Sequence, residues 1–438
     1  MRERWPWPPN ASTLAVIVSN SGTTVARTRF NSPTLRPLRS RDFRVIWLGS
    51  FVSNVGTWME ATALTTLVAR ETRSATQVAF AAIAGFLPSA FASPIGGALA
   101  DRFDRRRFLQ VTLLLETFFA GLLALVVSLG ERRTAPLAAI VFMAATVNSA
   151  ALPNRQAMFP SLVEPEDLPA AIALGSATWN GGRVFGPMLA VLAETIGPAW
   201  AFSINALSFL VLFGAWMTVT LPSLIKLDGP RLGLVALLRE GLGHIRRTPD
   251  LRFAIGFIAV LAGTAGPFIG LLAIMARVRF GIGAALFVTA QGFGAVCGAL
   301  STTRLSRRFG RRGTMLRAWF VLPVGLLLYA FAPHRLLAAA AVVLLGGAYM
   351  VLFAGAQSTL QLGSPPEVRA RVLAVFSVSL SAAYCAALLI SGRVADARDI
   401  QVATVMQAAL TLVGILVLAK AFPRWWHDDA PATTRQDR

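Results

Sequence analysis

The chain has 438 residues, of which 55% are hydrophobic and only 14% are charged, and its mean hydropathy is +0.61. This composition excludes an ordinary soluble globular protein and indicates a polytopic membrane protein. The formal net charge of +20 does not indicate nucleic-acid binding, because the basic residues lie in short loops and form no patch interleaved with aromatic residues. Cys297 and Cys385 both lie within apolar runs. They predict neither a disulfide framework nor a metal site, and no cofactor is expected.

Residues 1–42 are rich in Pro, Ser, Thr, Asn and Arg and contain one short apolar run. A signal peptide needs a longer apolar core and a small-residue cleavage site. This segment is therefore predicted to be a mostly disordered cytoplasmic tail. An over-extended start of the reading frame is an alternative explanation.

From Phe43 onward, twelve apolar segments are each long enough, at roughly twenty residues, to cross a bilayer as a helix. A polar linker divides them six plus six. The fold class predicted is thus an all-α membrane protein with bundles at residues 43–222 and 253–422, a linker at 223–252 and a cytoplasmic tail at 423–438. The segments run at about 43–69, 76–100, 108–129, 136–158, 168–193, 198–221, 253–276, 283–303, 314–332, 336–361, 369–395 and 401–422.

The linker contains Leu234, Leu238, Leu242 and Ile245 at helical spacing. This pattern predicts an amphipathic helix lying at the membrane interface. When both termini are placed in the cytoplasm, most Lys and Arg residues fall in cytoplasmic segments, as the positive-inside rule requires. We therefore expect a multi-pass protein of the cell membrane with both termini inside, acting as a monomer in the lipid bilayer.

Two loops between apolar segments repeat the sequence Arg-Phe-x-Arg-Arg about two hundred residues apart. The repeat indicates two related halves. An ordinary cytoplasmic loop needs Arg, but it does not need the glycine that stands four residues before an aspartate in the first copy. The residues of this pattern are Gly97, Asp101, Arg102, Arg105 and Arg106 in the first loop and Arg308, Arg311 and Arg312 in the second.

Both loops resemble the pattern Gly-x-x-x-Asp-Arg-x-Gly-Arg-Arg between the second and third helices of the major facilitator superfamily. Asp104 stands where the family has Gly, and Arg307 replaces the aspartate in the second copy. The resemblance implies twelve helices in two pseudo-symmetric bundles around a central cavity that opens alternately to either side. The stretches at residues 53–60, 153–163 and 237–252 are similar to its enterobactin-exporter-like, or transmembrane secretion effector, branch.

Gly182, Gly186 and Pro187 in the fifth segment resemble the antiporter motif of superfamily exporters, Gly-x-x-x-Gly-Pro-x-x-Gly-Gly. Ala190 and Val191 replace its last two glycines. Small residues four apart let helices approach closely, and Pro187 leaves a backbone carbonyl without its helical partner. Close packing in any helix bundle would use the same residues, but the match favours export over import.

Among the charged side chains in the apolar segments, three stand out as candidates, namely Glu60, Glu116 and Arg183. Charged groups in a membrane are costly and usually face protein or water. Glu60 and Arg183 are placed about 24 Å and about 22 Å along their helices, so we expect them to pair or share water in the outer half of the cavity. Protonation of Glu60 would then free Arg183, although a static buried ion pair is an equal alternative. Glu116 is expected to be a packed, protonated carboxyl.

Polar groups in the apolar segments are candidates for lining the cavity, because amide and indole groups can orient a ligand there. Bonding to neighbouring backbone is the alternative. These candidates are Trp58, Asn148, Gln291 and Gln357.

At the cytoplasmic face, the family resemblance implies that Asp101 helps to hold the two halves together when the cavity opens outward. The expected receptor is the start of the eleventh segment, where a helix N-terminus, Arg369 and Arg371 provide positive potential. Arg155, at the cytoplasmic end of the fourth segment, is a second possible partner.

These features predict a secondary transporter, not an enzyme, that exports small lipophilic or amphipathic molecules by proton antiport. A dedicated exporter of a siderophore or other secondary metabolite, and an uptake symporter of the same fold, are alternatives. A membrane-embedded enzyme is a further alternative, but His244, His334 and His427 lie in loops or tails and no catalytic arrangement is visible. Sodium coupling lacks an oxygen-rich cluster.

Overall fold

The computed structural model describes residues 33–102, 104–219 and 234–423, and the regular elements in these ranges are all helices. The helices of the first half follow a short 3-10 helix, η1 (Pro33–Arg39), and two more 3-10 turns join its fourth and fifth spans. They are α1 (Arg41–Thr72), α2 (Ala75–Phe86), α3 (Ser89–Arg102), α4 (Arg105–Ser128), α5 (Thr134–Met158), α6 (Leu168–Ile196) and α7 (Pro198–Thr218).

The second half begins with the linker helix and repeats the same plan. Its helices are α8 (Leu234–Arg247), α9 (Pro249–Thr264), α10 (Pro267–Gly270), α11 (Leu272–Phe280), α12 (Ala285–Ala330), α13 (Arg335–Gly363), α14 (Pro366–Ala397) and α15 (Ile400–Ala421).

Nine helical segments within the described residues are long and apolar enough to cross a membrane. One of them, α12, contains two predicted spans: its backbone leaves the helical conformation at Gly310, where φ is 71° and ψ is 163°. This bend requires glycine, because a side chain is strained at positive φ. The helices α1 and α6 correspond in position to the first and fifth predicted spans.

Two predicted spans are interrupted where the sequence contains proline. The second is divided into α2 and α3 beside Pro88, and the seventh is divided into α9, α10 and α11 beside Pro267. Proline lacks the N–H group that would continue the helical hydrogen bonds, so a break at these positions is expected physically. The predicted ranges 76–100 and 253–276 missed these breaks.

Pro33–Arg39, which the sequence predicted to belong to a disordered tail, form η1. η1 is held against the loop before α6 by Arg36, which lies 3.1 Å from both Glu166 and Asp167. Residues 1–32 and 424–438, and the predicted linker before α8, lie outside the described residues. The predicted amphipathic helix corresponds to α8, and Ile245 is buried there.

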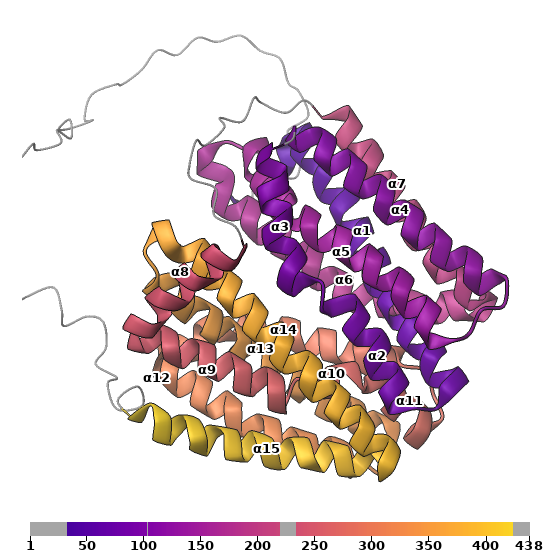
Figure 1. The fold of residues 1–438 in the computed structure, drawn as a ribbon, viewed down its shortest axis with the longest axis vertical. Coiled ribbons are helices and arrows are strands. Elements are labelled where there is room, and N and C mark those ends of the chain that lie inside the picture. The colour runs from indigo at the N-terminus through magenta and orange to yellow at the C-terminus, as the bar shows by residue number, and fades with distance from the viewer. Residues whose placement is uncertain (1–32, 103, 220–233, 424–438) are drawn as a thin grey trace, which may run out of the picture.

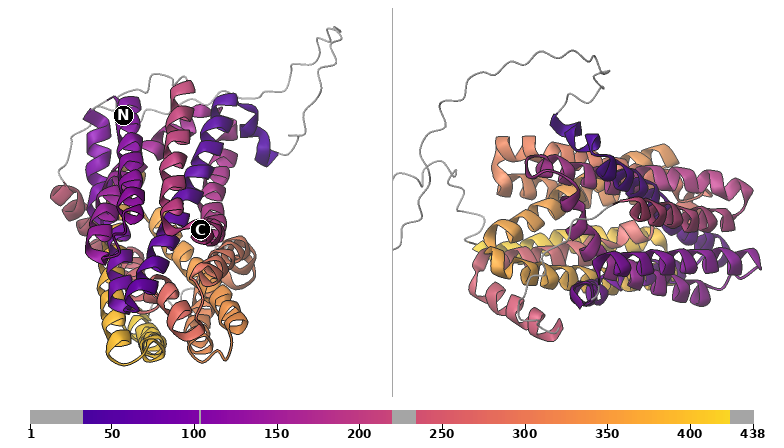
Figure 2. Two further views of the ribbon diagram at one scale, coloured as in Figure 1. Left: turned by 90° about the vertical axis from the view of Figure 1, so that its right-hand side faces the viewer. Right: turned by 90° about the horizontal axis from the view of Figure 1, so that it is seen from above.

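The two halves lie side by side, and Figure 1 shows that they converge near α2 and α11 and diverge toward α3 and α8. Contacts between the halves join α2 and α3 to α14, α1 to α11, and α6 to α12, and α3 also contacts α8. The further views in Figure 2 show that the spans run roughly along one common direction. The halves therefore meet along helices that belong to different bundles, with the tighter end at the α1–α2 turn.

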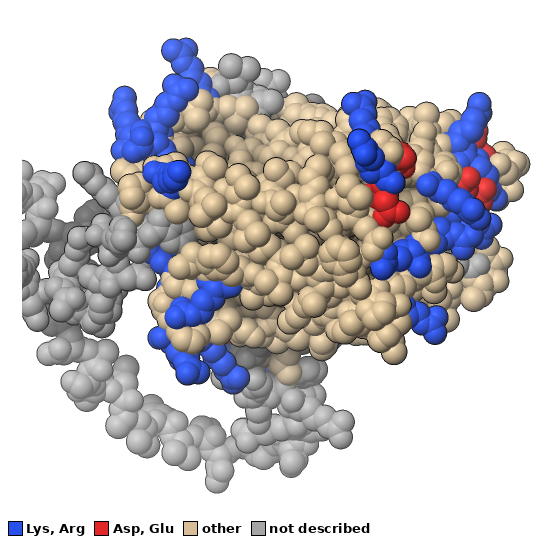
Figure 3. Space-filling model, turned by 90° about the horizontal axis from the view of Figure 1, so that it is seen from below, with Lys and Arg blue, Asp and Glu red and all other residues tan. Residues whose placement is uncertain are grey.

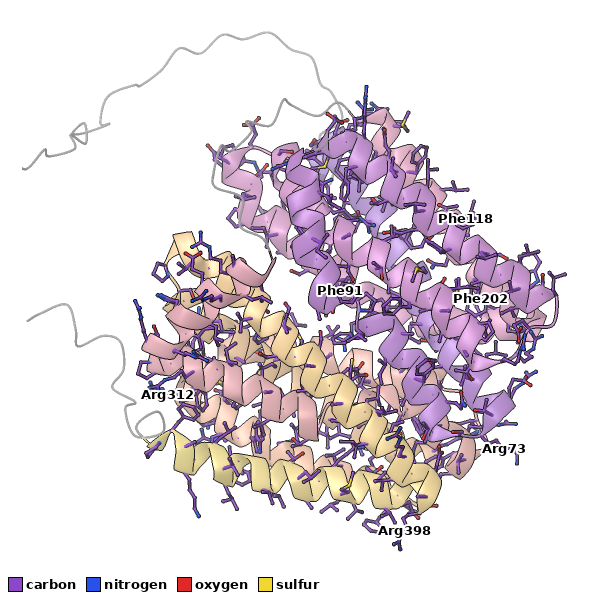
Figure 4. All side chains as sticks on the ribbon, viewed as in Figure 1. Arg73, Phe91, Phe118, Phe202, Arg312 and Arg398 are labelled. Carbon is purple, nitrogen blue, oxygen red and sulfur yellow. The ribbon has the colours of Figure 1, made fainter. Side chains whose placement is uncertain are left out.

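Charged residues gather at the two ends of the bundle. Figure 3 shows them separated by a broad belt without charge, and Figure 4 shows Arg312 at one end and Arg73 and Arg398 at the other. Exposed apolar side chains, such as the 58% exposed Phe118, cover the surface between the ends. This is the surface that a bilayer requires. We call the end with Arg312 the Arg-rich end and the opposite end the Ser74 end.

Candidate functional sites in the helix bundle

Glu60 lies inside the first half, between α1 and α7. The Nδ2 group of Asn205 donates a hydrogen bond to Glu60 Oε2 at 2.7 Å, and Ser208 in turn donates to Asn205 Oδ1 at 3.2 Å. Gly56, one turn earlier on α1, permits this approach, because a Cβ atom there would lie 2.5 Å from the Asn205 and Ser208 side-chain oxygens. Glu60 is thus held by neutral partners.

Glu116 and Arg155 form an ion pair between α4 and α5, by a hydrogen bond from Arg155 Nη2 to Glu116 Oε1. The Glu116 side chain is 1% exposed and that of Arg155 is 20% exposed. Glu116 Oε2 and Arg155 Nε are buried without a hydrogen-bond partner. Asn148, another predicted site residue, lies close to Glu116. The sequence predicted a packed, protonated carboxyl at Glu116, whereas the structure pairs this side chain with the Arg155 guanidinium.

Arg183 contacts two other predicted site residues, Trp58 and Gln291. Its guanidinium lies 5.2 Å from the ring centre of Trp58 on α1, and its Nη2 donates to Gln291 Oε1 on α12 at 3.1 Å. The predicted pair with Glu60 is not formed. Residues 58 and 60 point about 200° apart around α1, so Arg183 against Trp58 cannot also face Glu60.

Aromatic side chains that the sequence did not single out surround this cluster. Trp179 packs edge-on against Trp58 with ring centres 5.9 Å apart. Tyr349 on α13 lies near Arg183 and packs against Phe268. The sequence could not select Trp179 and Tyr349, because aromatic residues within apolar spans are common in any membrane protein.

The glycine motif brings α1 and α6 into close contact. A Cβ atom on Gly182 would lie 2.9 Å from the Asn54 backbone, and one on Gly186 would lie 2.6 Å from Trp58 Cβ. Pro187 follows inside α6. The small residues thus allow α6 to pack closely against α1, and this contact brings Arg183 beside Trp58.

The Arg-rich end contains the predicted gate. Gly97 has no side chain, and the side chains of Asp101 and Arg102 lie outside the described part of the chain, as does the predicted contact of Asp101. Two residues expected to pair with Asp101 form ion pairs with other acidic residues: Arg371 pairs with Glu240 on α8, and Arg155 pairs with Glu116. Arg106 Nη2 donates to the Met217 carbonyl at 3.1 Å, which ties α4 to the end of α7.

The remaining predicted residues lie apart from the Arg183 cluster. Arg308, Arg311 and Arg312 lie beside the α12 bend at the Arg-rich end. Gln357 is on α13, roughly 12 Å along the helix from Tyr349 at a rise of about 1.5 Å per residue. Among the described residues, no group of His, Cys, Asp and Glu could hold a metal ion.

At the Ser74 end, the structure shows a contact that the sequence did not reveal. Asp396, at the end of α14, accepts hydrogen bonds from Ser74 Oγ at 2.7 Å and from the backbone N–H groups of Ala75 and Thr76 at 2.6 and 3.0 Å. A carboxylate from the second half thereby caps the N-terminus of α2 in the first half. Ser74 was a visible helix cap, but its partner lies more than 300 residues away.

Known proteins with related sequences identify the family to which this chain is similar. A family model described as transmembrane secretion effector matches residues 32–436. The multidrug efflux pump Tap of Mycolicibacterium fortuitum is 26% identical over 402 residues, which is 87% of this chain and 95% of that protein. The macrolide efflux protein A of Streptococcus pyogenes is 23% identical over 236 residues, which is 52% of this chain and 55% of that protein.

Solved structures with low sequence identity share the fold. A crystal structure of a mutant of the nucleoside transporter NupG superposes with a TM-score of 0.73 at 11% identity, over 87% of this chain and 100% of that chain. An inward-facing bacterial homologue of the iron transporter ferroportin has a TM-score of 0.66 at 17% identity, over 87% and 98%. The predicted two-bundle transporter architecture is confirmed.

Proposed function

The chain belongs to the transmembrane secretion effector family, and from this we propose that it is a secondary active transporter that exports small lipophilic or amphipathic molecules by proton antiport. Its relatives include pumps named for multidrug and macrolide efflux. In the proposed topology both termini are cytoplasmic, the Arg-rich end faces the cytoplasm and the protein works as a monomer in the cell membrane. The contacts that join the halves at the Ser74 end then correspond to an inward-facing state.

The observation that carries the antiport proposal is the Glu116–Arg155 pair. Glu116 is almost fully buried, whereas Arg155 is partly exposed. Protonation of Glu116 would remove the charge that holds the Arg155 guanidinium. We therefore propose Glu116 as the coupling carboxyl, with Glu60 as a second candidate carboxyl in the same half.

The coupling proposal makes a prediction for transport into inverted membrane vesicles. With an acidic vesicle interior, an antiporter accumulates its substrate, here tested with ethidium and with a macrolide. We expect Glu116→Gln to reduce gradient-driven accumulation by about 5- to 150-fold, because coupling between sites has a typical free energy of about 1–3 kcal/mol. The matched control is Glu131→Gln, at a loop acid that bonds to Arg133. Gradient-driven uptake by Glu116→Gln at the wild-type rate would contradict the proposed coupling site.

A further inference from the structure

The cluster of Arg183, Trp58 and Gln291 contains three hydrogen-bond donors without acceptors. Arg183 Nε, Trp58 Nε1 and Gln291 Nε2 are all buried and have no partner. The amide orientation of Gln291 is fixed, because its Oε1 accepts from Arg183. Since buried donors are normally satisfied, three of them on side chains in contact indicate a missing acceptor.

The cluster also lacks a compensating negative charge. Among the described residues, no acidic side chain lies within ion-pair distance of Arg183, and its neighbours on α1, α12 and α13 are the neutral Trp58, Gln291 and Tyr349. A charged side chain inside a membrane is usually paired with an opposite charge or reaches water. An anion bound here would supply both the charge and the acceptors.

We propose that this cluster binds the anionic group of the transported substrate, and that the substrate class is an aromatic molecule carrying a carboxylate or similar oxyanion. The proposal rests on the export function above and specifies its substrate. The guanidinium and the two N–H groups would bind the oxyanion. The rings of Trp58, Trp179 and Tyr349 offer flat apolar surfaces for the aromatic part.

The position of the cluster fits such a role. Arg183 and Trp58 belong to the first half, whereas Gln291 belongs to the second. Gly292, next to Gln291, lets α12 approach the Arg183 backbone, because a Cβ atom there would lie 2.6 Å from the Arg183 carbonyl oxygen. A ligand that bonds to residues of both halves changes its contacts when the halves move, which is what alternating access requires.

Binding can be measured without transport, with purified protein in nanodiscs of zwitterionic lipid. The probes are 1-naphthylacetate, the neutral 2-(1-naphthyl)ethanol and the cationic 2-(1-naphthyl)ethylamine, compared by equilibrium dialysis with empty nanodiscs subtracted. We expect wild type to bind the carboxylate at least about tenfold more tightly than either other probe, because hydrogen bonds to charged groups are the stronger ones. Arg183→Gln should abolish this preference, and Gln291→Leu should reduce it.

Arg183→Lys keeps the charge and should retain part of the preference, and Arg133→Gln, at an exposed loop arginine, should leave it unchanged. Equal binding of the three probes by wild type, or an intact preference in a folded Arg183→Gln protein, would overturn the proposal. The preference is a ratio within one preparation, so it does not depend on how much protein folds. Carboxylate binding without any gradient-driven export would support this site and contradict the export function. Export of cations alone, without carboxylate binding, would support the export function and contradict this site.

Discussion

The two halves share a plan but differ in the chemistry that they bury. The first half contains Glu60, Glu116, Arg155 and Arg183 within its spans, whereas the sequence from Leu251 to Pro366 contains no Asp or Glu. Within the described part of the second half, fully buried hydrogen bonds such as that from Trp319 Nε1 to the Thr411 carbonyl, at 2.9 Å, join neutral groups. Under the proposed antiport mechanism, the candidate coupling carboxyls Glu60 and Glu116 therefore both lie in the first half.

The largest effect expected from breaking this asymmetry is at the Glu116–Arg155 pair. Removal of one partner leaves a buried charge, so Arg155→Leu should lower the free energy of unfolding by about 3 kcal/mol. Replacement of both by leucine should restore most of this stability, because an apolar pair has no charge to desolvate. Thermal melts of the purified proteins in detergent measure the effect.

Transport by the double variant separates coupling from packing. A stable double variant without gradient-driven uptake would show that the charges serve transport. A double variant that transports at the wild-type rate would show instead that the pair only fixes the packing of α4 against α5.

A second prediction tests the contact between α1 and α6 that positions Arg183. Gly186→Leu should destabilise the protein by about 1–3 kcal/mol, since overpacking of a tight contact forces the helices apart. Gly121→Leu is the control, because a Cβ atom on Gly121 would meet nothing within 4 Å. Melting temperatures in detergent provide the comparison, and equal values for the two variants would contradict the close helix contact.

The sequence predicted the positions of the membrane-spanning helices better than it predicted which side chains contact one another. Apolar length sets where helices lie, so the predicted segment 108–129 corresponds closely to α4, at Arg105–Ser128. Distance along a span also placed Glu60 and Arg183 at similar depth, but depth does not fix the direction in which a side chain points around its helix. Side-chain pairing depends on depth, on direction and on the neighbouring helices. Asn205 as the partner of Glu60, and Gln291 as the partner of Arg183, therefore could not be predicted from spacing.

The smallest effect is expected where the second half contributes a carboxylate to the first. Asp396→Ala removes the cap on α2, and a helix cap contributes about 0.5–2 kcal/mol, so closure at the Ser74 end should weaken by roughly two- to thirtyfold. An Ala79→Cys substitution, at a buried position near Gly392, reports this closure by its rate of labelling with a maleimide in a background without Cys297 and Cys385. Asp399→Ala is the matched control, because Asp399 accepts from the Gln401 N–H at 2.6 Å and caps only its own helix, α15. Faster labelling with Asp396→Ala alone would show that the second half stabilises the inward-facing state through this contact, whereas equal rates would mean that the packing of α2 against α14 suffices.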